Sequence, residues 1–432
     1  MSLVLSLNSK SSDYIDKLTS INNDLELKIE SKFGNGEPKY VYPFKHLGKS
    51  ESDQEEIVLP FAYGVKCMKL SRPMRSNFSA VNVNFTGSLR EEQLEIKKEA
   101  IRNLSSTGSI LISLYTGGGK TVTAINIASS IGFRTLVIVN KIVLIQQWKD
   151  SINRFCHGAT IQCLTPKTKE INSDFCIVNA QNIEKFPRGF FDDIGLCIVD
   201  EAHMIMAETL SRSMFYIHPR YLIGLTATPY RPDGLDILLS LCFGSKKIIR
   251  KLYRRHTVFK VDTGYKPPIK KTIQGRLDWN SILDAQANNV NRNNIIIQLI
   301  KSHPTRNFLV LVKRVSQGEY LSQLLRDEGE YVTDLIGSNQ EFCKDARILI
   351  GTCQKVGVGF DHVKLDTLLL AADIEEYFIQ YLGRVFRSLE NEPIIFDLVD
   401  KNPVLEKHFN TRRDIYQSHG GTIKEFVVSN LI

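Results

Sequence analysis

Apolar runs of strand length alternate with helical patterns in two separate parts of the chain, and this alternation restricts the possible folds more than any other feature. The first series of runs comprises residues 110–114, 135–139, 175–178, 196–199 and 221–225, and the second comprises 308–312, 347–350, 367–370 and 394–398. Strands that alternate with helices form a parallel sheet covered by helices. The sequence therefore predicts an α/β protein with two tandem parallel-sheet domains, whose ligands bind outside the carboxyl ends of the strands.

A glycine-rich turn joins the first run to a helical pattern. Glycines allow backbone N–H groups to surround an anion, and the start of the following helix adds positive potential. Lys120 is placed to reach the β- and γ-phosphates of a nucleotide, and Thr121 to ligate magnesium. The strict phosphate-loop pattern has a glycine where Leu114 stands, so a plain glycine turn at a strand end is the alternative. The candidate phosphate-binding residues are Thr116, Gly117, Gly118, Gly119, Lys120 and Thr121.

Two adjacent acids, Asp200 and Glu201, follow the run 196–199. Carboxylates at the end of a buried strand are costly unless they serve a charged ligand. A magnesium–nucleotide site accounts for both, because Asp200 would hold the metal and Glu201 would orient and deprotonate the attacking water. A solvated loop is the alternative. The pair lies 80 residues after Lys120, which leaves room for several β-α units of one sheet and favours the nucleotide site.

A cationic cluster lies on a predicted helix within the second series. Gln380, Gly383, Arg384 and Arg387 are spaced so that they share one helix face. Gly383 lowers helix stability by about 1 kcal/mol relative to alanine, which suggests that another group approaches this face closely. Two arginines aimed at a γ-phosphate would stabilise the charge of a transition state. An ordinary basic helix face is the alternative if the cluster is considered alone.

With these residues the chain resembles the superfamily 2 helicases and translocases of the DEAH type, from about residue 85 to residue 400. The resemblance implies two tandem RecA-like domains, each of which holds part of one site for ATP and Mg²⁺. It implies that Gln93 reads the adenine, and that Gly359 and Asp361 belong to a motif that contacts the nucleotide. The departures from the family pattern are Leu114 and Val358.

The same resemblance implies how hydrolysis is coupled to nucleic acid. His203 would link the hydrolysis site to the motif at residues 224–229, in which Thr226 and Thr228 couple hydrolysis to movement. Thr352 would touch a backbone phosphate of the bound strand.

Two stretches narrow the resemblance within the superfamily. Residues 228–234 and 243–244 are similar to the branch that holds excision-repair helicases, phage recombination helicases and restriction translocases, and residues 357–387 are similar to the poxvirus transcript-release helicases. These similarities imply a DNA track rather than RNA, travel from 3′ to 5′, and a role in viral transcription with the transcription machinery as partner. Three alternatives stay open: a repair or recombination helicase, an RNA helicase, and a nucleic-acid-binding scaffold that has lost turnover.

The net charge of +8 is concentrated in one stretch of the chain. Residues 241–290 carry 11 basic and 3 acidic side chains, whereas the remaining basic and acidic side chains nearly balance. Lysine and arginine contacts to phosphates give affinity that does not depend on sequence, so nucleic acid is the expected partner, with Arg254 and Arg255 as candidate contacts. A solvated linker that is basic by accident is the alternative.

The predicted organisation is an accessory domain at 1–84, an ATP-binding domain at 85–240, a basic connecting segment at 241–290 and a second domain at 291–432. No apolar run approaches the roughly 18 residues that span a bilayer. We therefore expect no membrane contact and an intracellular protein, in the cytoplasm, a viral factory or a virion if it is viral and otherwise in the nucleus. The eight cysteines lack C-x-x-C spacing and predict neither zinc nor disulfides. Trp148, at helical spacing from apolar residues, is expected in the core.

Overall fold

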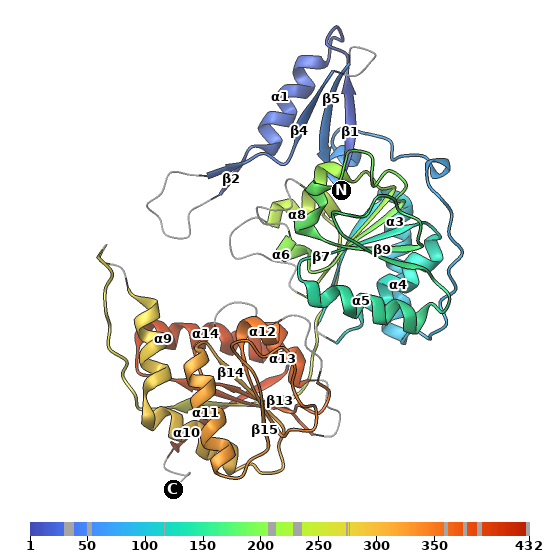
Figure 1. Cartoon of the computed structure of the whole chain (residues 1–432). Helices are drawn as coiled ribbons and strands as arrows, with labels where there is room; N and C mark the ends of the chain where they lie inside the picture. Colours follow the sequence, from blue (N-terminus) through green and yellow to red (C-terminus); the bar gives the residue numbers. More distant parts are fainter. Residues whose placement is uncertain are drawn as a thin grey trace. The chain divides into compact units, whose positions relative to one another are not determined.

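The computed structural model describes residues 1–29, 39–49, 54–115, 117–205, 213–227, 236–273, 275, 277–357, 362–374, 378–386 and 391–428. The chain divides into two compact units, one made of residues 1–114 and 118–250 and the other of residues 115–117 and 251–432. Each unit contains a seven-stranded parallel sheet with helices on its faces (Figure 1). The predicted α/β class with two tandem parallel-sheet domains is confirmed.

The sheet of the first unit has the order β12-β6-β11-β10-β7-β9-β8. Its strands are β6 (Ser109–Leu114), β7 (Thr135–Val139), β8 (Ile161–Leu164), β9 (Phe175–Asn179), β10 (Leu196–Val199), β11 (Tyr221–Thr226) and β12 (Lys247–Arg250). Its helices are α3 (Glu91–Thr107), α4 (Lys120–Ile131), α5 (Ile142–Phe155), α6 (Ala202–Ile205) and α8 (Asp236–Phe243), with short 3-10 turns η2 (Ala180–Lys185) and η3 (Met214–Tyr216). Because β6, β11, β10 and β7 are parallel neighbours, their carboxyl ends meet at one edge of the sheet.

The N-terminal region forms a small antiparallel sheet of order β1-β5-β4. Its elements are β1 (Ser2–Leu7), α1 (Tyr14–Leu25), β2 (Leu27–Ile29), β3 (Lys39–Val41), β4 (Lys45–Lys49), β5 (Glu55–Pro60), α2 (Phe61–Lys66) and the turn η1 (Arg75–Asn77). Leu3 and Phe61 pack in the same core as Leu111 and Phe243. The region predicted as an accessory domain at 1–84 therefore shares the core of the first unit. Leu5, Ile21 and their neighbours form a separate hydrophobic cluster.

The second unit has a sheet of order β15-β16-β14-β17-β18-β13-β19. Its strands are β13 (His256–Asp262), β14 (Phe308–Val312), β15 (Val332–Leu335), β16 (Ile348–Thr352), β17 (Thr367–Leu370), β18 (Ile394–Val399) and β19 (Gly421–Phe426). Its helices are α9 (Trp279–Asn288), α10 (Val290–Lys301), α11 (Val315–Asp327), α12 (Cys353–Gly357), α13 (Phe378–Val385) and α14 (Pro403–Ser418).

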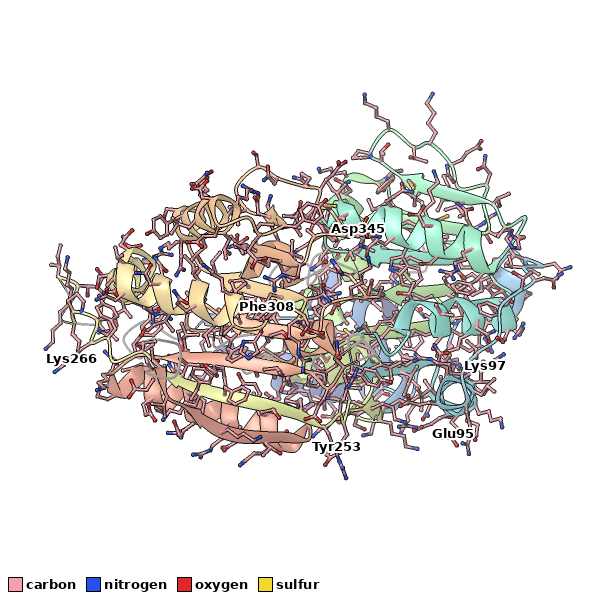
Figure 2. All side chains as sticks on the ribbon, turned by 90° about the horizontal axis from the view of Figure 1, so that it is seen from below. Glu95, Lys97, Tyr253, Lys266, Phe308 and Asp345 are labelled. Carbon is pink, nitrogen blue, oxygen red and sulfur yellow. The ribbon has the colours of Figure 1, made fainter. Side chains whose placement is uncertain are left out.

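Alternate residues of β14 lie on opposite faces of this second sheet, and both faces are buried. Leu309 packs in a cluster with α13 and α14, whereas Phe308 packs in a cluster with α10 and α11. Figure 2 shows Phe308 in the interior of this unit and Tyr253 at its surface. A strand that is buried on both faces is apolar throughout, which explains why the central strands stood out as continuous apolar runs.

The basic stretch 241–290 contributes one strand to each of the two large sheets. It supplies β12 to the first sheet and β13 to the second, and the units divide at Arg250 and Lys251. The predicted boundary at residue 240 needs correction, because it falls inside α8. Among the described residues, no helix has the length and apolar character needed to cross a membrane.

Candidate active site

The glycine turn leads from the end of β6 into α4, as predicted. Gly117 and Gly119 have φ angles of +88° and +80°, in the left-handed region that glycine adopts without strain. The Nζ of Lys120 donates a hydrogen bond to the carbonyl oxygen of Leu114 at 3.3 Å. The N–H groups of the first turn of α4 have no acceptor within the helix, so the turn and the helix start present donors to an anion. Thr116 lies outside the described residues.

Gln93, on α3, reaches the same turn. Its side chain is only 4% exposed. Its Oε1 accepts a hydrogen bond from the backbone N–H of Arg90 at 2.9 Å, and its Nε2 donates to the carbonyl oxygen of Gly119 at 3.4 Å. A Cβ atom at Gly119 would lie 2.1 Å from this Nε2, so only glycine allows the approach. The structure thus brings Gln93 to the phosphate turn, and its reading of adenine stays a prediction.

The acid pair lies at the carboxyl end of β10. Asp200 is 6% exposed, and its Oδ1 accepts a hydrogen bond from the backbone N–H of Glu201 at 2.9 Å. Burial and the neighbouring charge of Glu201 raise the pKa of Asp200 to about 6, against the opposing effects of a hydrogen bond from Trp148 and the charge of Lys120. The glycine turn and the acid pair follow the parallel strands β6 and β10, which both pair with β11, so they lie at the same edge of the sheet.

Glu201 has an unusual backbone. Its φ angle is +46°, which costs a non-glycine residue on the order of 1–3 kcal/mol and occurs preferentially at functional sites. Its Oε2 is buried and has no hydrogen-bond partner among the described residues. A buried carboxylate oxygen without a donor is costly in the protein alone, and a water molecule or a bound ligand would satisfy it.

Trp148 was expected only to fill the core, and its 1% exposure confirms the core position. Its indole Nε1–H also donates a hydrogen bond to the Oδ2 of Asp200 at 2.8 Å. Both oxygens of Asp200 are therefore fixed by the protein. Sequence reasoning missed this positioning role, although a buried tryptophan generally needs an acceptor for its N–H.

Lys141, which precedes α5, is a second residue near the acid pair that sequence reasoning did not single out. Burial lowers the pKa of Lys141, while the nearby charge of Glu201 opposes that shift.

His203 and Thr226 come together as the resemblance implied. The Nδ1 of His203 and the Oγ1 of Thr226 share a hydrogen bond of 2.7 Å, and the same Nδ1 lies 3.5 Å from the Oε2 of Glu201. Both side chains are almost completely buried. A continuous polar path therefore runs from the acid pair at β10 to the end of β11. Thr228 lies outside the described residues.

The second unit buries its cationic helix. Gln380 is 4% exposed and Arg384 is 7% exposed, both on α13. The hydroxyl of Tyr381 donates to the carbonyl oxygen of Cys353 at 2.8 Å, which ties α13 to the residue after Thr352 at the end of β16. Arg387, Gly359 and Asp361 lie outside the described residues.

A buried ion cluster holds the segment that leads to α13. The guanidinium of Arg412 contacts Asp397 at 2.8 Å, Asp373 at 2.7 Å and the carbonyl oxygen of Ile374 at 3.1 Å. Burial opposes the charge of Arg412, but the two carboxylates outweigh it and hold the pKa of Arg412 above its usual range. No local pattern indicates this cluster, because its members lie on α14, on β18 and in the loop after β17.

The two candidate nucleic-acid arginines differ in their surroundings. The guanidinium of Arg254 donates to the carbonyl oxygen of Phe386, just after α13, and to that of Asn391 at 2.9 Å. Arg255 is exposed. Arg254 thus has a structural use within the second unit that its sequence context did not indicate, and Arg255 is the better placed of the two to meet a polyanion.

Comparisons with known proteins agree with this geometry. Residues 86–231 match the model of the family described as type III restriction enzyme, res subunit. The chain is 42% identical to "Putative helicase 161L" of Invertebrate iridescent virus 6, over 99% of this chain and 100% of that protein. It is 24% identical to "DNA 3'-5' translocase XPB2" of Sulfurisphaera tokodaii, over 76% of this chain and 84% of that protein.

A solved structure shares the fold. A variant of S. cerevisiae Dbp5 bound to RNA and ADP BeF3 aligns with a TM-score of 0.57 and 13% identity, over 80% of this chain and 95% of that chain. At this level of identity the likeness concerns the tandem RecA-like fold alone.

Proposed function

This chain belongs to the superfamily 2 helicases, and from that premise we propose that it is an ATP-dependent motor that moves along a nucleic-acid strand, with DNA as track and 3′-to-5′ travel. The observation that carries the proposal is the set of polar side chains that meet at one edge of the first sheet. The glycine turn and the acid pair follow the parallel strands β6 and β10, and Glu201 is linked through His203 to Thr226 at the end of β11.

The residues of the first unit fit ATP with Mg²⁺. The left-handed glycines at 117 and 119 and the start of α4 suit a triphosphate, and Lys120 adds the cation. Mg²⁺ in nucleotide sites uses one or two carboxylates together with phosphate oxygens and water, so Asp200 and the hydroxyl of Thr121 are sufficient protein ligands. The bound metal would supply charge stabilisation to the reacting phosphoryl group.

The remaining side chains have separate tasks in this proposal. Glu201 orients the attacking water and accepts its proton, and its buried Oε2, which accepts no hydrogen bond from the described residues, suits that task. His203 transmits the state of Glu201 to Thr226, because it contacts both. Arg384 and Arg387 stabilise the charge that develops on the transferred phosphoryl group, and the neutral amide of Gln380 can donate a hydrogen bond to it.

Relatives support different tracks. XPB2 is named for DNA and for 3′-to-5′ movement, whereas Dbp5 was solved with RNA. A sequence relative named for RNA also matches, since "Putative ATP-dependent RNA helicase L396" of Acanthamoeba polyphaga mimivirus is 25% identical over 94% of this chain. We favour DNA from the resemblance of residues 228–234 and 243–244 together with XPB2. We also propose a role in viral transcription, in particular transcript release, which the resemblance of residues 357–387 and the viral source of one relative support.

The test is an ATPase assay with single-stranded DNA, duplex DNA, RNA and an RNA–DNA hybrid in parallel. We expect DNA to stimulate hydrolysis most strongly, and Glu201→Gln to lower turnover by about 10²–10⁴-fold while ATP still binds. Glu184→Gln, an exposed acid of the same unit, is the matched control. Stronger stimulation by RNA would favour an RNA helicase, and an unchanged rate in Glu201→Gln would favour a scaffold without turnover.

A further inference from the structure

A pocket of about 220 Å³ lies near the amino ends of β10 and β11, whereas the candidate active site lies at their carboxyl ends. Its walls come from β4, from the 188–192 loop that precedes β10, and from residues 215–218, which precede β11. Asp200 and Thr226 stand at the carboxyl ends of those same two strands. Since strands rise about 3.3 Å per residue, β11 alone separates the two sites by roughly 20 Å.

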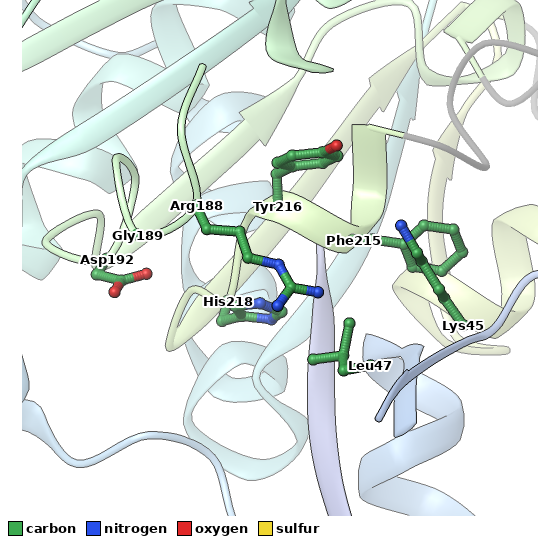
Figure 3. Close-up of a pocket in the computed structure, with 8 residues that line it drawn as sticks. All are labelled: Lys45, Leu47, Arg188, Gly189, Asp192, Phe215, Tyr216 and His218. Atoms are coloured by element: carbon green, nitrogen blue, oxygen red, sulfur yellow. The ribbon is translucent and has the colours of Figure 1, made fainter. Parts of the chain in front are cut away.

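Two cations of the pocket are available to a ligand. Lys45, on β4, and Arg188, in the loop, are exposed, and neither side chain has a hydrogen bond or ion pair within the described part of the chain. Asp192 is the acid among the lining residues, so the lining has a net positive charge. In Figure 3 the Arg188 side chain extends from its loop into the space between Tyr216 and His218, and Lys45 rises from β4 toward Phe215.

Aromatic rings line the pocket beside these cations. Phe215 and Tyr216 are half-buried. Burial lowers the pKa of His218 to about 4, so its ring is neutral at pH 7 and adds a flat surface rather than a charge. Its Nδ1 lies 3.2 Å from the Oγ of Ser2, which fixes the ring. Aromatic faces next to unpaired cations are the combination that holds a base and its phosphate in proteins that bind single strands.

We propose that this pocket binds one nucleotide unit, with its phosphate on Lys45 and Arg188 and its base against Tyr216. The volume of about 220 Å³ is below the roughly 300–1,000 Å³ that drug-sized ligands fill, so the pocket suits a single unit. The unit is part of a single strand or a free nucleotide, since both offer the same chemistry. The site is separate from the ATP site and adds a second contact for nucleic acid, or for a nucleotide effector, on the first unit.

The first test removes the cations in the full-length protein. Lys45→Ala/Arg188→Ala and a matched control, Lys167→Ala/Lys169→Ala, lose the same charge from exposed positions. Binding of a fluorescent oligothymidylate and of thymidine monophosphate is measured by anisotropy and by competition, without ATP. We expect the pocket variant to bind the oligonucleotide about tenfold more weakly, with a salt dependence shallower by about 0.7 per lost phosphate contact, and the control to match the wild type.

The two ligands identify the source of the nucleotide. Weaker binding of the oligonucleotide alone assigns the pocket to a strand, and weaker binding of the monophosphate as well assigns it to nucleotides in general. Unchanged binding of both ligands overturns the proposal, including the case in which the pocket serves an acidic peptide instead.

The second test concerns the base. Tyr216→Ala should weaken binding about five- to tenfold, whereas Tyr216→Phe should retain it because the ring remains. The ATPase rate without nucleic acid should stay at the wild-type value in both, and Tyr216→Phe, which keeps the ring packed against the core, should also keep the wild-type melting temperature. An equal loss of ligand affinity in Tyr216→Phe and Tyr216→Ala would contradict a stacking role. Because binding is measured without ATP, failure of this pocket and failure of the proposed motor activity are distinguishable.

Discussion

At the residue scale, the geometry of Asp200 depends on a single indole. Trp148→Phe would remove the donor to Oδ2 while it keeps most of the buried volume. A buried acceptor that loses its partner costs about 1–3 kcal/mol, so we expect lower stability together with an ATPase rate reduced at saturating ATP. Thermal unfolding and ATPase kinetics measure the two effects. An unchanged turnover number at lower stability would show that Trp148 only fills the core.

Thr226→Val tests the path from hydrolysis to the strand. The substitution keeps the shape of the side chain but removes the hydroxyl that contacts His203. We expect ATP hydrolysis without nucleic acid to persist and the stimulation by nucleic acid to fall severalfold, whereas Thr226→Ser should behave as wild type. If the two rates fall in parallel, the hydrogen bond serves the active site as a whole rather than coupling.

The charged groups of this site could be predicted from the sequence, but their supports could not. Lys120, Asp200 and Glu201 each follow a recognisable strand, so their place at one sheet edge followed from the parallel fold. The bond from Trp148 to Asp200 joins residues 52 positions apart, and nothing in the local pattern of either residue indicates the other. The left-handed φ of Glu201 is likewise imposed by packing, because local preference disfavours it.

At the scale of elements, sequence patterns found the central strands and missed those near the edges. β12 and β19 lie at sheet edges and contain charged residues, as edge strands often do, so they do not form apolar runs. β13 alternates buried and partly exposed residues within the basic stretch, and its charges suggested a connector. Tertiary pairing with β18 and β19 makes it a strand.

Arg254 and Arg255, which directly precede β13, should have different functions. Arg255→Glu is expected to weaken nucleic-acid binding and to flatten its salt dependence, because the side chain is exposed. Arg254→Glu is expected to lower the melting temperature, because it loses two carbonyl acceptors next to α13. Binding isotherms at several salt concentrations and thermal unfolding of both variants are the measurements. Identical behaviour of the two variants would contradict this separation.

The ion cluster that precedes α13 makes the stability of the second unit depend on pH in the acid range. Burial opposes ionisation of Asp373, but hydrogen bonds and charge from His408 and Arg412 outweigh it, so the pKa of Asp373 lies below its usual range. A depressed pKa contributes stability above the unfolded value, and that contribution is lost as pH falls through the folded value. We expect unfolding to become easier below about pH 4. Asp373→Asn should be less stable at pH 7 and should lose part of this acid dependence in denaturant titrations.

At the scale of the whole molecule, the proposed motor divides its chemistry between two units that each fold around their own sheet. The first holds the groups that bind the triphosphate and activate water, and the second holds Gln380 and Arg384 on a buried helix. This division predicts that substitutions in the two units cause different defects, one in ATP affinity and the other in the chemical step, although both abolish turnover.

Lys120→Ala should lose ATP affinity, because the cation of the phosphate turn is gone. Arg384→Ala should bind ATP with nearly wild-type affinity and lose turnover by about 10³-fold or more, because an arginine of this type acts on charge that develops during the reaction. Arg384→Lys should recover little, since lysine lacks the planar fork. Equilibrium binding of a non-hydrolysable ATP analogue and single-turnover hydrolysis separate the two defects, and Arg413→Ala, a partly exposed arginine of α14, is the control. If Arg384→Ala hydrolysed ATP at the wild-type rate, the second unit would have no part in catalysis, and the movement of the chain along a strand would need a different source of energy.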